Sequence, residues 1–280
     1  MRFVHLLDAV HSGGAAPPPP DPRKEQLLKI PRSLAPALLA SLLLLPLRPA
    51  SAQEAAGPSW DLKLGLSYLS TSGNSETRSA GFDALYHRAW GPWGIEAAGN
   101  AINASQQGRA TAESYLLKVR GKRTLSGPFE LTAGLQGEKN RFAGLDLRST
   151  LDLSLLWNAI ATDRFKLHTL SGLAWVDEDF TGASPANGYL AALLGVGGEG
   201  KLGAVSGWTF EATYVPNFED SDDYRLAGNL ALQAALTDRL ALRVGYDYKF
   251  DHQPAPGFKR EDSATAASLV VLLGKKPEAK

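Results

Sequence analysis

The sequence contains no cysteine and only one methionine, and its 29 basic and 29 acidic side chains cancel to zero net charge. Without cysteine the chain has no disulfides, no thiolate metal sites and no cysteine nucleophiles. A zero net charge gives no basic surface for tracking nucleic-acid phosphates. A membrane-spanning helix needs about 20 consecutive apolar residues, and no stretch of the sequence is that long. The sequence therefore predicts no nucleic-acid partner. If the chain crosses a membrane, it is expected to do so with β-strands.

The N-terminal region has the three parts of a secretory signal peptide. A basic flank precedes a short apolar run at 34–47, and the run is followed by small side chains at Ala50 and Ala52. Signal peptidase recognises small residues at these two positions. We expect residues 1–52 to be an N-terminal extension and a cleaved signal peptide, with cleavage before Gln53. An uncleaved signal anchor is the alternative, and the shortness of the apolar run argues against it.

From Trp60 onward, apolar and polar residues alternate with period two. The pattern is clearest at 60–68 and at 240–250. Alternation at this period places one set of side chains on each face of a strand, which a helix cannot do. The sequence predicts about twelve strands, an even number as in bacterial single-chain barrels. Weaker or vaguer runs complete the set at 82–86, 93–103, 115–119, 129–135, 151–157, 165–175, 189–193, 210–214, 224–236 and 265–273.

The predicted connections alternate between longer polar loops and shorter turns, an asymmetry typical of outer-membrane barrels. Both termini are then expected at the short-turn, periplasmic end. The longer set is 71–76, 103–110, 141–147, 177–187, 216–223 and 251–261, and the shorter set is 90–94, 125–128, 161–164, 201–207 and 237–239.

The two faces of the predicted strands differ in chemistry. One face carries Leu, Val, Ala, Tyr and Phe, with aromatic residues near strand ends, where such rings meet lipid headgroups. The other carries charges of both signs in nearly equal number. Because a charge at the middle of the lipid-facing wall costs roughly 2–4 kcal/mol, we expect the charged face to line the lumen. The predicted lumen-lining charges are Asp61, Lys63, Lys118, Arg120, Glu130, Lys166, Arg225, Arg243, Asp247 and Lys249.

The predicted fold is an all-β transmembrane antiparallel up-and-down β-barrel of about 12 strands, with short periplasmic turns and longer extracellular loops. The barrel is expected to span residues 60–273, after a short periplasmic segment at 53–59 and before a polar tail at 274–280. A soluble lipocalin-like barrel is the alternative fold, because alternation alone does not tell which face points inward.

Several stretches resemble the bacterial family of salt-induced outer-membrane proteins, a domain of unknown function. The matching pieces are Ser72-Gly73-Asn74-Ser75-Glu76-Thr77, residues 141–148, Thr162-Asp163-Arg164, Thr237-Asp238-Arg239-Leu240 and residues 257–262. Together they follow one another along nearly the whole predicted mature chain. The resemblance implies an outer-membrane β-barrel and brings no catalytic residues.

A membrane-embedded hydrolase is the enzymatic alternative. The predicted mature chain has three histidines, His87, His168 and His252, and Ser171 is near His168 in the sequence. A serine nucleophile needs a base within about 3 Å and a third group that orients the base. The sequence shows no such grouping, so we predict that the protein is not an enzyme and has no cofactor.

Acidic clusters on two predicted extracellular loops are weak candidates for a divalent-cation site, since Ca²⁺ prefers several carboxylate oxygens. Their spacing matches no defined loop motif, and such charge runs are usually solvated. On this hypothesis millimolar Ca²⁺ raises the melting temperature beyond the effect of Na⁺. The residues are Asp177, Glu178, Asp179, Glu219, Asp220, Asp222 and Asp223.

The sequence thus favours a non-enzymatic barrel in the outer membrane of a Gram-negative bacterium, with a structural or stress-related (salt or osmotic) envelope role and a largely ion-paired lumen. The alternatives are a narrow, weakly selective pore for ions or small solutes, then a soluble ligand-binding barrel or a membrane hydrolase. The expected partners are outer-membrane lipid, lipopolysaccharide and, during biogenesis, the barrel-assembly machinery.

The signal-peptide interpretation predicts the N-terminus of the exported protein. Edman sequencing or intact-mass analysis of protein isolated from the cell envelope should give a chain that begins at Gln53. A chain that still carries residues 34–47 would instead indicate an uncleaved anchor.

Overall fold

The computed structural model describes residues 59–71, 77–181 and 187–275. The predicted signal peptide, its cleavage site after Ala52 and the loop predicted at 71–76, except Thr71, lie outside these ranges. Within them, twelve antiparallel strands and one short 3₁₀ helix follow in order. Their bounds are β1 Ser59–Thr71, β2 Thr77–Trp90, β3 Trp93–Gln106, β4 Arg109–Thr124, β5 Phe129–Asn140, η1 Arg141–Ala143, β6 Leu145–Ala161, β7 Phe165–Phe180, β8 Asn187–Lys201, β9 Ser206–Pro216, β10 Tyr224–Ala235, β11 Leu240–Asp251 and β12 Glu261–Lys275.

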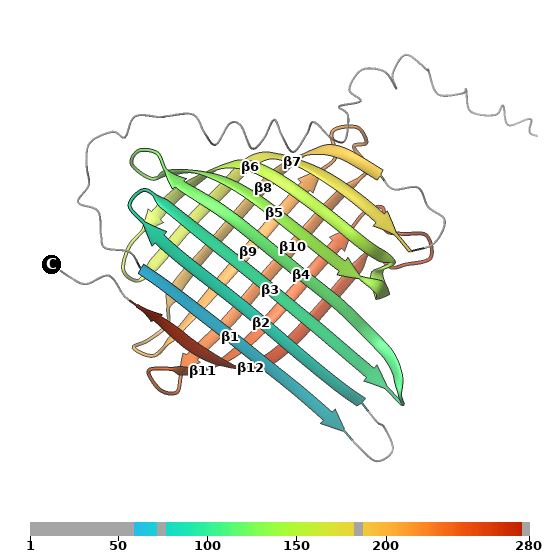
Figure 1. Cartoon of the computed structure of the whole chain (residues 1–280), viewed down its shortest axis with the longest axis horizontal. Helices are drawn as coiled ribbons and strands as arrows, with labels where there is room; N and C mark the ends of the chain where they lie inside the picture. Colours follow the sequence, from blue (N-terminus) through green and yellow to red (C-terminus); the bar gives the residue numbers. More distant parts are fainter. Residues whose placement is uncertain (1–58, 72–76, 182–186, 276–280) are drawn as a thin grey trace, which may run out of the picture.

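The twelve strands form one closed barrel in which each strand pairs with its neighbours in the sequence (Figure 1). The barrel closes between the first strand and the last, where β1 pairs antiparallel with β12 from Trp60 opposite Lys275 to Leu66 opposite Leu269. This pairing joins the two ends of the sheet, as an all-β structure surrounded by lipid requires. The predicted strand number and antiparallel up-and-down topology are confirmed.

No helix among the described residues is both long and apolar enough to span a membrane.

Side-chain contacts between non-neighbouring strands show which face points inward. Arg148 on β6 bonds to Asp251 on β11, and Arg243 on β11 bonds to Asp83 on β2. These strands are not adjacent in the sheet, so their side chains can meet only through the barrel interior. The strand register extends this inward assignment to alternate residues around the barrel.

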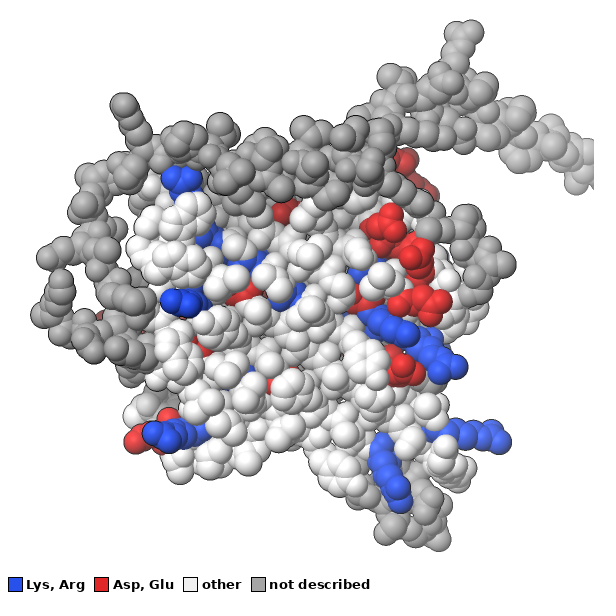
Figure 2. All heavy atoms as spheres, viewed as in Figure 1, with Lys and Arg blue, Asp and Glu red and all other residues white. Residues whose placement is uncertain are grey.

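The opposite face carries large exposed apolar side chains in the middle of the strands. Leu135, Leu155 and Leu230 are 58%, 41% and 50% exposed. In Figure 2 the middle of the wall facing the viewer is mainly uncharged, and most protruding charged side chains lie toward the two ends. A soluble barrel would have the reverse arrangement, with charges outside and apolar groups within. The apolar wall therefore faces lipid, and the barrel is a transmembrane one.

Aromatic residues mark both ends of this apolar wall. Near one end Phe129 stacks on Trp157 at a centroid distance of 6.5 Å. Near the other end Tyr224 packs on Phe250 at 5.8 Å and on His252 at 4.7 Å. Amphipathic rings at these positions are typical of the two lipid headgroup regions of a membrane barrel.

The connections differ between the two ends of the barrel. One end, the short-turn end, carries 91–92, 125–128, 162–164, 202–205 and 236–239, and β1 begins and β12 ends there. The opposite end, the long-loop end, carries the 217–223 and 252–260 connections among others. The predicted difference in length between the shorter turns and the longer loops is present, and three of the loops predicted for the long-loop end need correction.

Two of those corrections come from strands that extend further than predicted. The loop predicted at 103–110 shortens to a two-residue turn, because Gln107 and Gly108 both have positive φ, 50° and 74°, as a tight β-hairpin requires. The loop predicted at 177–187 begins later, since β7 continues to Phe180. Glu178, predicted in an extracellular loop, is therefore a strand residue.

The third correction is the loop predicted at 141–147. Residues 141–143 form η1, whose cap Asn140 accepts a hydrogen bond from the Ala143 N–H at 3.3 Å. Gly144 then adopts a left-handed φ of 71°, and β6 begins at Leu145. The left-handed glycine ends the helical turn and redirects the chain into the next strand.

The lipid-facing assignment predicts a depth-dependent cost for a charge on the outer wall. Leu155→Arg, at the middle of β6, should destabilise the barrel in lipid vesicles by about 2–4 kcal/mol. Leu147→Arg is the matched control, because Leu147 is also exposed but lies near the long-loop end of the same strand; its cost should be roughly 0–1 kcal/mol. Urea titration of vesicle-inserted protein measures both, and equal costs would contradict the assignment.

Candidate functional site: the barrel lumen

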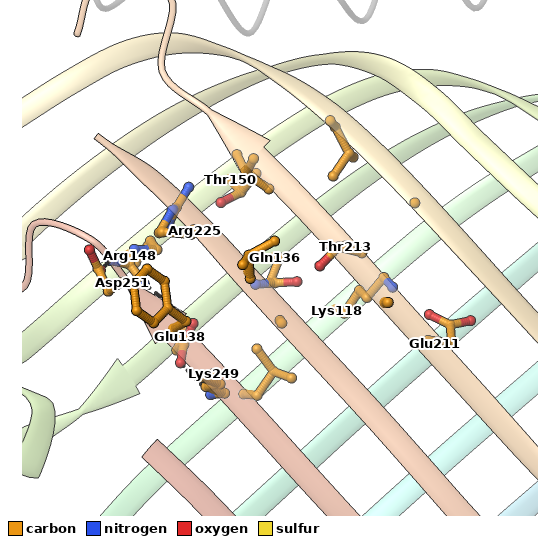
Figure 3. A pocket seen from close by; sticks show the side chains of 18 of the residues that line it. Lys118, Gln136, Glu138, Arg148, Thr150, Glu211, Thr213, Arg225, Lys249 and Asp251 are labelled. Atoms are coloured by element: carbon orange, nitrogen blue, oxygen red, sulfur yellow. Dashed lines mark hydrogen bonds and ion pairs between the residues drawn. The ribbon is translucent and has the colours of Figure 1, made fainter. Parts of the chain in front are cut away.

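Three links between opposite parts of the wall cross the lumen near the long-loop end. Arg148 on β6 donates from Nη2 to Asp251 Oδ2 on β11 at 2.8 Å. Lys249, also on β11, donates to Glu138 Oε1 on β5. Figure 3 shows Arg148, Glu138, Lys249 and Asp251 gathered in the interior. Because β11 is not adjacent to β5 or β6, these bonds tie one side of the barrel to the other and narrow the lumen.

Glu178 provides the third link. It accepts hydrogen bonds from Arg225 Nη1 on β10 at 3.1 Å and from Arg148 Nε on β6. Its side chain is 5% exposed, and those of Arg148 and Arg225 are 11% and 12% exposed. The Tyr189 hydroxyl donates to the same carboxylate oxygen at 3.3 Å. Charges so far from bulk water need such pairing, because an unpaired buried charge is strongly unfavourable.

The 252–260 connection between β11 and β12 lies over this network. Ala255 is 4% exposed, and a Cβ atom added to Gly144 would lie 2.5 Å from Phe258. Gly144 belongs to the β5–β6 connection, so the segment reaches a distant part of the wall. A hydrogen bond from Gln253 Nε2 to Asp220 Oδ2 at 2.9 Å holds it to the neighbouring 217–223 connection.

The lumen also contains a cavity of about 260 Å³. It extends from the 252–260 segment to His168 and Glu211, and Figure 3 shows part of its lining, with Lys118, Gln136 and Thr213 toward one side. Its lining combines charged groups with apolar side chains. The apolar ones include Leu116, Leu145, Leu156, Leu170, Leu193 and Val215.

The interior is not equally packed on all sides. Thr132, Val176 and Tyr189, on strands β5, β7 and β8, are at most 2% exposed. On the β10 to β12 part of the wall, inward positions toward the long-loop end, such as Ala227 and Asp262, are exposed to solvent. Inward positions of the same strands toward the short-turn end, such as Ala231, Ala241 and Val270, are buried.

A second group of charges lies at the short-turn end. His87 on β2 contacts Asp61 on β1 at 3.3 Å and Glu96 on β3 at 3.0 Å. Lys122 on β4 donates to the same oxygen of Glu96 at 2.9 Å. Each of these contacts joins neighbouring strands, so they cover the wall without spanning the lumen.

The ten residues predicted to line the lumen lie on the inward face by strand register. The structure brings most of them to a partner, but Lys63 and Lys118 form no hydrogen bond or ion pair within the described ranges. The contacts of the other eight are Asp61–His87, Arg120–Asp152, Glu130–Asn158, Lys166–Glu199, Arg225–Glu178, Arg243–Asp83, Asp247–Asn229 and Lys249–Glu138.

The sequence reasoning missed Arg148, the residue with the most partners in the lumen network. Arg148 lies between the loop predicted at 141–147 and the strand predicted at 151–157. Its spacing from Asp152 carried the signal, because residues four apart on a strand share a face. The same signal identifies Lys122, which is four residues from Lys118 on β4. The sequence pattern also puts Asp83, Glu138, Asp152, Glu211 and Asp262 on the inward face, where the register has them. The inward charges that it did not identify include Glu96, Lys122, Arg148, Glu178, Glu199, Lys201 and Asp251.

The three histidines of the described ranges do not form the grouping that a serine hydrolase needs. His168 points inward, 3.8 Å from Glu211, whereas Ser171 lies at odd spacing on the same strand and faces outward. His252 stacks on Tyr224 and bonds through Nδ1 to the Asp222 carbonyl oxygen.

The acidic residues proposed for a divalent cation are distributed over different faces. Asp177 and Asp179 lie on the outward side of β7, opposite in orientation to Glu178. Asp220 accepts hydrogen bonds from Asp222 N and Gln253 Nε2. The remaining two are Glu219, whose backbone N–H bonds to Asn217, and Asp223, whose carboxylate accepts from Asn217. In the part of the chain that the structure describes, no three His, Asp or Glu side chains gather around a possible metal position.

Solved structures of similar fold include bacterial porins and channels. The NanC porin is 12% identical at a TM-score of 0.44, and the similarity covers 78% of this chain and 99% of that one. An outer membrane channel from Pseudomonas putida F1 is 10% identical at a TM-score of 0.47, covering 80% and 97%. The KdgM porin, solved in complex with disordered oligogalacturonate, is 11% identical at a TM-score of 0.41, covering 78% and 99%.

Among curated proteins, none matches this sequence. One family model does match, over residues 64–272, which includes all or part of each of the twelve strands. Its description is a protein of unknown function, DUF481. The chain belongs to the DUF481 family.

Proposed function

We propose that this protein is a non-enzymatic barrel of the Gram-negative outer membrane that serves a structural or stress-related role, in salt or osmotic stress, with its lumen held narrow by cross-lumen ion pairs. One observation carries the proposal. Three links join β5, β6 and β7 to β10 and β11 across the interior: Lys249–Glu138, Arg148–Asp251 and Arg225–Glu178.

The outer-membrane location is supported by the apolar wall, the two aromatic zones and the expected signal peptide. Closed barrels with short turns at one end and longer loops at the other are typical of that membrane. The partners that follow are outer-membrane lipid, lipopolysaccharide against the long-loop end and the assembly machinery during insertion. The non-enzymatic role is supported by His168 and Ser171 lying on opposite faces of β7.

A narrow pore for ions or small solutes is the second candidate function. The cavity of about 260 Å³ and the solvated wall near Ala227 favour it. A pore with strong ion preference usually presents a ring of one charge sign. Here acidic and basic groups alternate within the network, so any conductance should show weak selectivity.

Single-channel recording in planar lipid bilayers tests the cross-lumen links. The wild-type protein should show low conductance with little preference for cations or anions. Lys249→Met removes the bond to Glu138 while keeping a side chain of similar length. Because the narrowest cross-section limits ion flow, the single-channel conductance of the variant should be at least about twice that of the wild type.

Lys166→Met provides the matched control. Lys166 also donates to a glutamate, at 2.7 Å from Glu199, but its partner lies on the neighbouring strand β8. Its loss removes a lumen charge without breaking a cross-lumen link, so the conductance should stay at the wild-type level. Equal changes in both variants, or a large conductance in the wild type, would contradict the proposed narrowing.

A further inference from the structure

Lys118 differs from most other inward-facing cations of the barrel. Arg120, Lys122 and Lys166 each have a carboxylate oxygen within 2.9 Å, and the cross-lumen cations are paired as well. Within the described ranges, Lys63 and Lys118 lack such a contact, as do Arg109 and Lys201 at the ends of their strands. Lys118 lines the lumen cavity, whereas Lys63 is not part of its lining.

The cavity is more basic than acidic. Its lining has seven lysines and arginines against five aspartates and glutamates. Glu178, behind the lining, pairs with Arg148 and Arg225 and raises the acidic count by one. Two of the seven cations, Lys259 and Arg260, are exposed residues of the 252–260 connection, so the wall cation that is left without a carboxylate partner in the cavity is Lys118. A cation without a partner favours an anion beside it.

Groups beside Lys118 extend the hydrogen-bonding surface. Arg120 lies two residues further along β4 on the same face. Within the described residues its guanidinium donates to Asp152 through Nη2, and its Nε has no hydrogen-bond partner. Gln136 lies directly opposite Lys118 on β5, and Thr213 points toward the same space in Figure 3. An ammonium group, a guanidinium and an amide provide several donors for one small anionic group.

The rest of the lining is apolar. Leu156, Leu170 and Leu193 are each 7% exposed and pack together, and all three border the cavity. A volume of about 260 Å³ is slightly below the range of pockets for drug-sized ligands, about 300–1,000 Å³. The space suits a compact molecule with an apolar body and one charged end.

We propose that the lumen cavity is a binding site for a small organic carboxylate, with the carboxylate at Lys118 and the apolar body against the Leu156–Leu170–Leu193 cluster. Inorganic phosphate would satisfy the cation but leave the apolar part of the cavity unfilled, so it fits less well. The site requires only the barrel interior and goes beyond the proposed envelope role. Binding and conductance can therefore succeed or fail separately.

Isothermal titration calorimetry of the membrane-extracted protein in detergent micelles tests this site, with benzoate as the probe. Benzoate should bind with one site per barrel. Benzamide has the ring without the charge, and acetate and inorganic phosphate have charge without the ring. Each should bind at least tenfold more weakly, since a lost charge-assisted bond or a lost apolar contact is worth about that factor.

Three variants assign the binding to the cavity. Lys118→Gln should weaken benzoate binding about tenfold or more. Lys63→Gln, which removes an inward lysine outside the cavity that also lacks a hydrogen-bonded carboxylate within the described residues, should leave benzoate binding unchanged. Lys118→Arg keeps the charge and should retain most of the affinity, and it also covers the case in which Lys118→Gln fails to fold.

The outcomes that overturn the proposal are equally definite. Absence of saturable benzoate binding would rule out the site, and equal binding of benzamide would show that charge plays no part. Equal loss in Lys63→Gln and Lys118→Gln would reduce the effect to general lumen charge. Tighter binding of phosphate than of benzoate would replace the organic carboxylate with an inorganic anion.

Discussion

A strand inside hydrocarbon has no water to bond its backbone N–H and C=O groups, so each must find a partner in another strand. The pairing of β1 with β12 meets this requirement, because without it two strand edges would face lipid. Closure also divides every strand into an outer and an inner face. The apolar wall, the aromatic zones and the collection of charges in the lumen all follow from that division.

The inner face carries charges of both signs, and most of them are paired. Charges confined to a lumen of limited water content have to be compensated locally, since an uncompensated buried charge is expensive. Arg148 shows how this works, with Glu178 on the neighbouring strand and Asp251 across the barrel. Lys118 is an exception that coincides with a cavity. In the described part of the chain, most other inward charges are paired with a charge of opposite sign, and Lys118 is not.

The sequence was sufficient for the strand number, the alternation of faces and the contrast between the two ends. Each depends on local period and turn chemistry, which a single strand already displays. The ends of strands were harder. Glu178 appeared to be part of an acidic loop because Asp177 and Asp179 flank it, yet β7 continues through all three. In the sequence, a run of charged residues at the end of a strand has the same pattern as a solvated loop.

Cross-lumen contacts could not be predicted from the sequence at all. Lys249 and Glu138 are 111 residues apart, and their meeting depends on the tilt and stagger of the strands around the closed barrel. The cavity has the same origin, since it reflects where opposite walls fail to touch. The sequence around Lys118, or around Leu156, Leu170 and Leu193, does not indicate how far these side chains lie from the opposite wall of the barrel.

Accessibility of single cysteines on β10 tests most directly whether the charged face is an interior and the apolar face meets lipid. The chain has no cysteine, so Ala227→Cys and Leu230→Cys would each carry one thiol, inward and outward respectively. In lipid vesicles a water-soluble charged thiol reagent should modify the cysteine at 227 readily and leave the one at 230 largely unreacted. Fast modification at 230 with protection at 227 would reverse the two faces and contradict the membrane barrel.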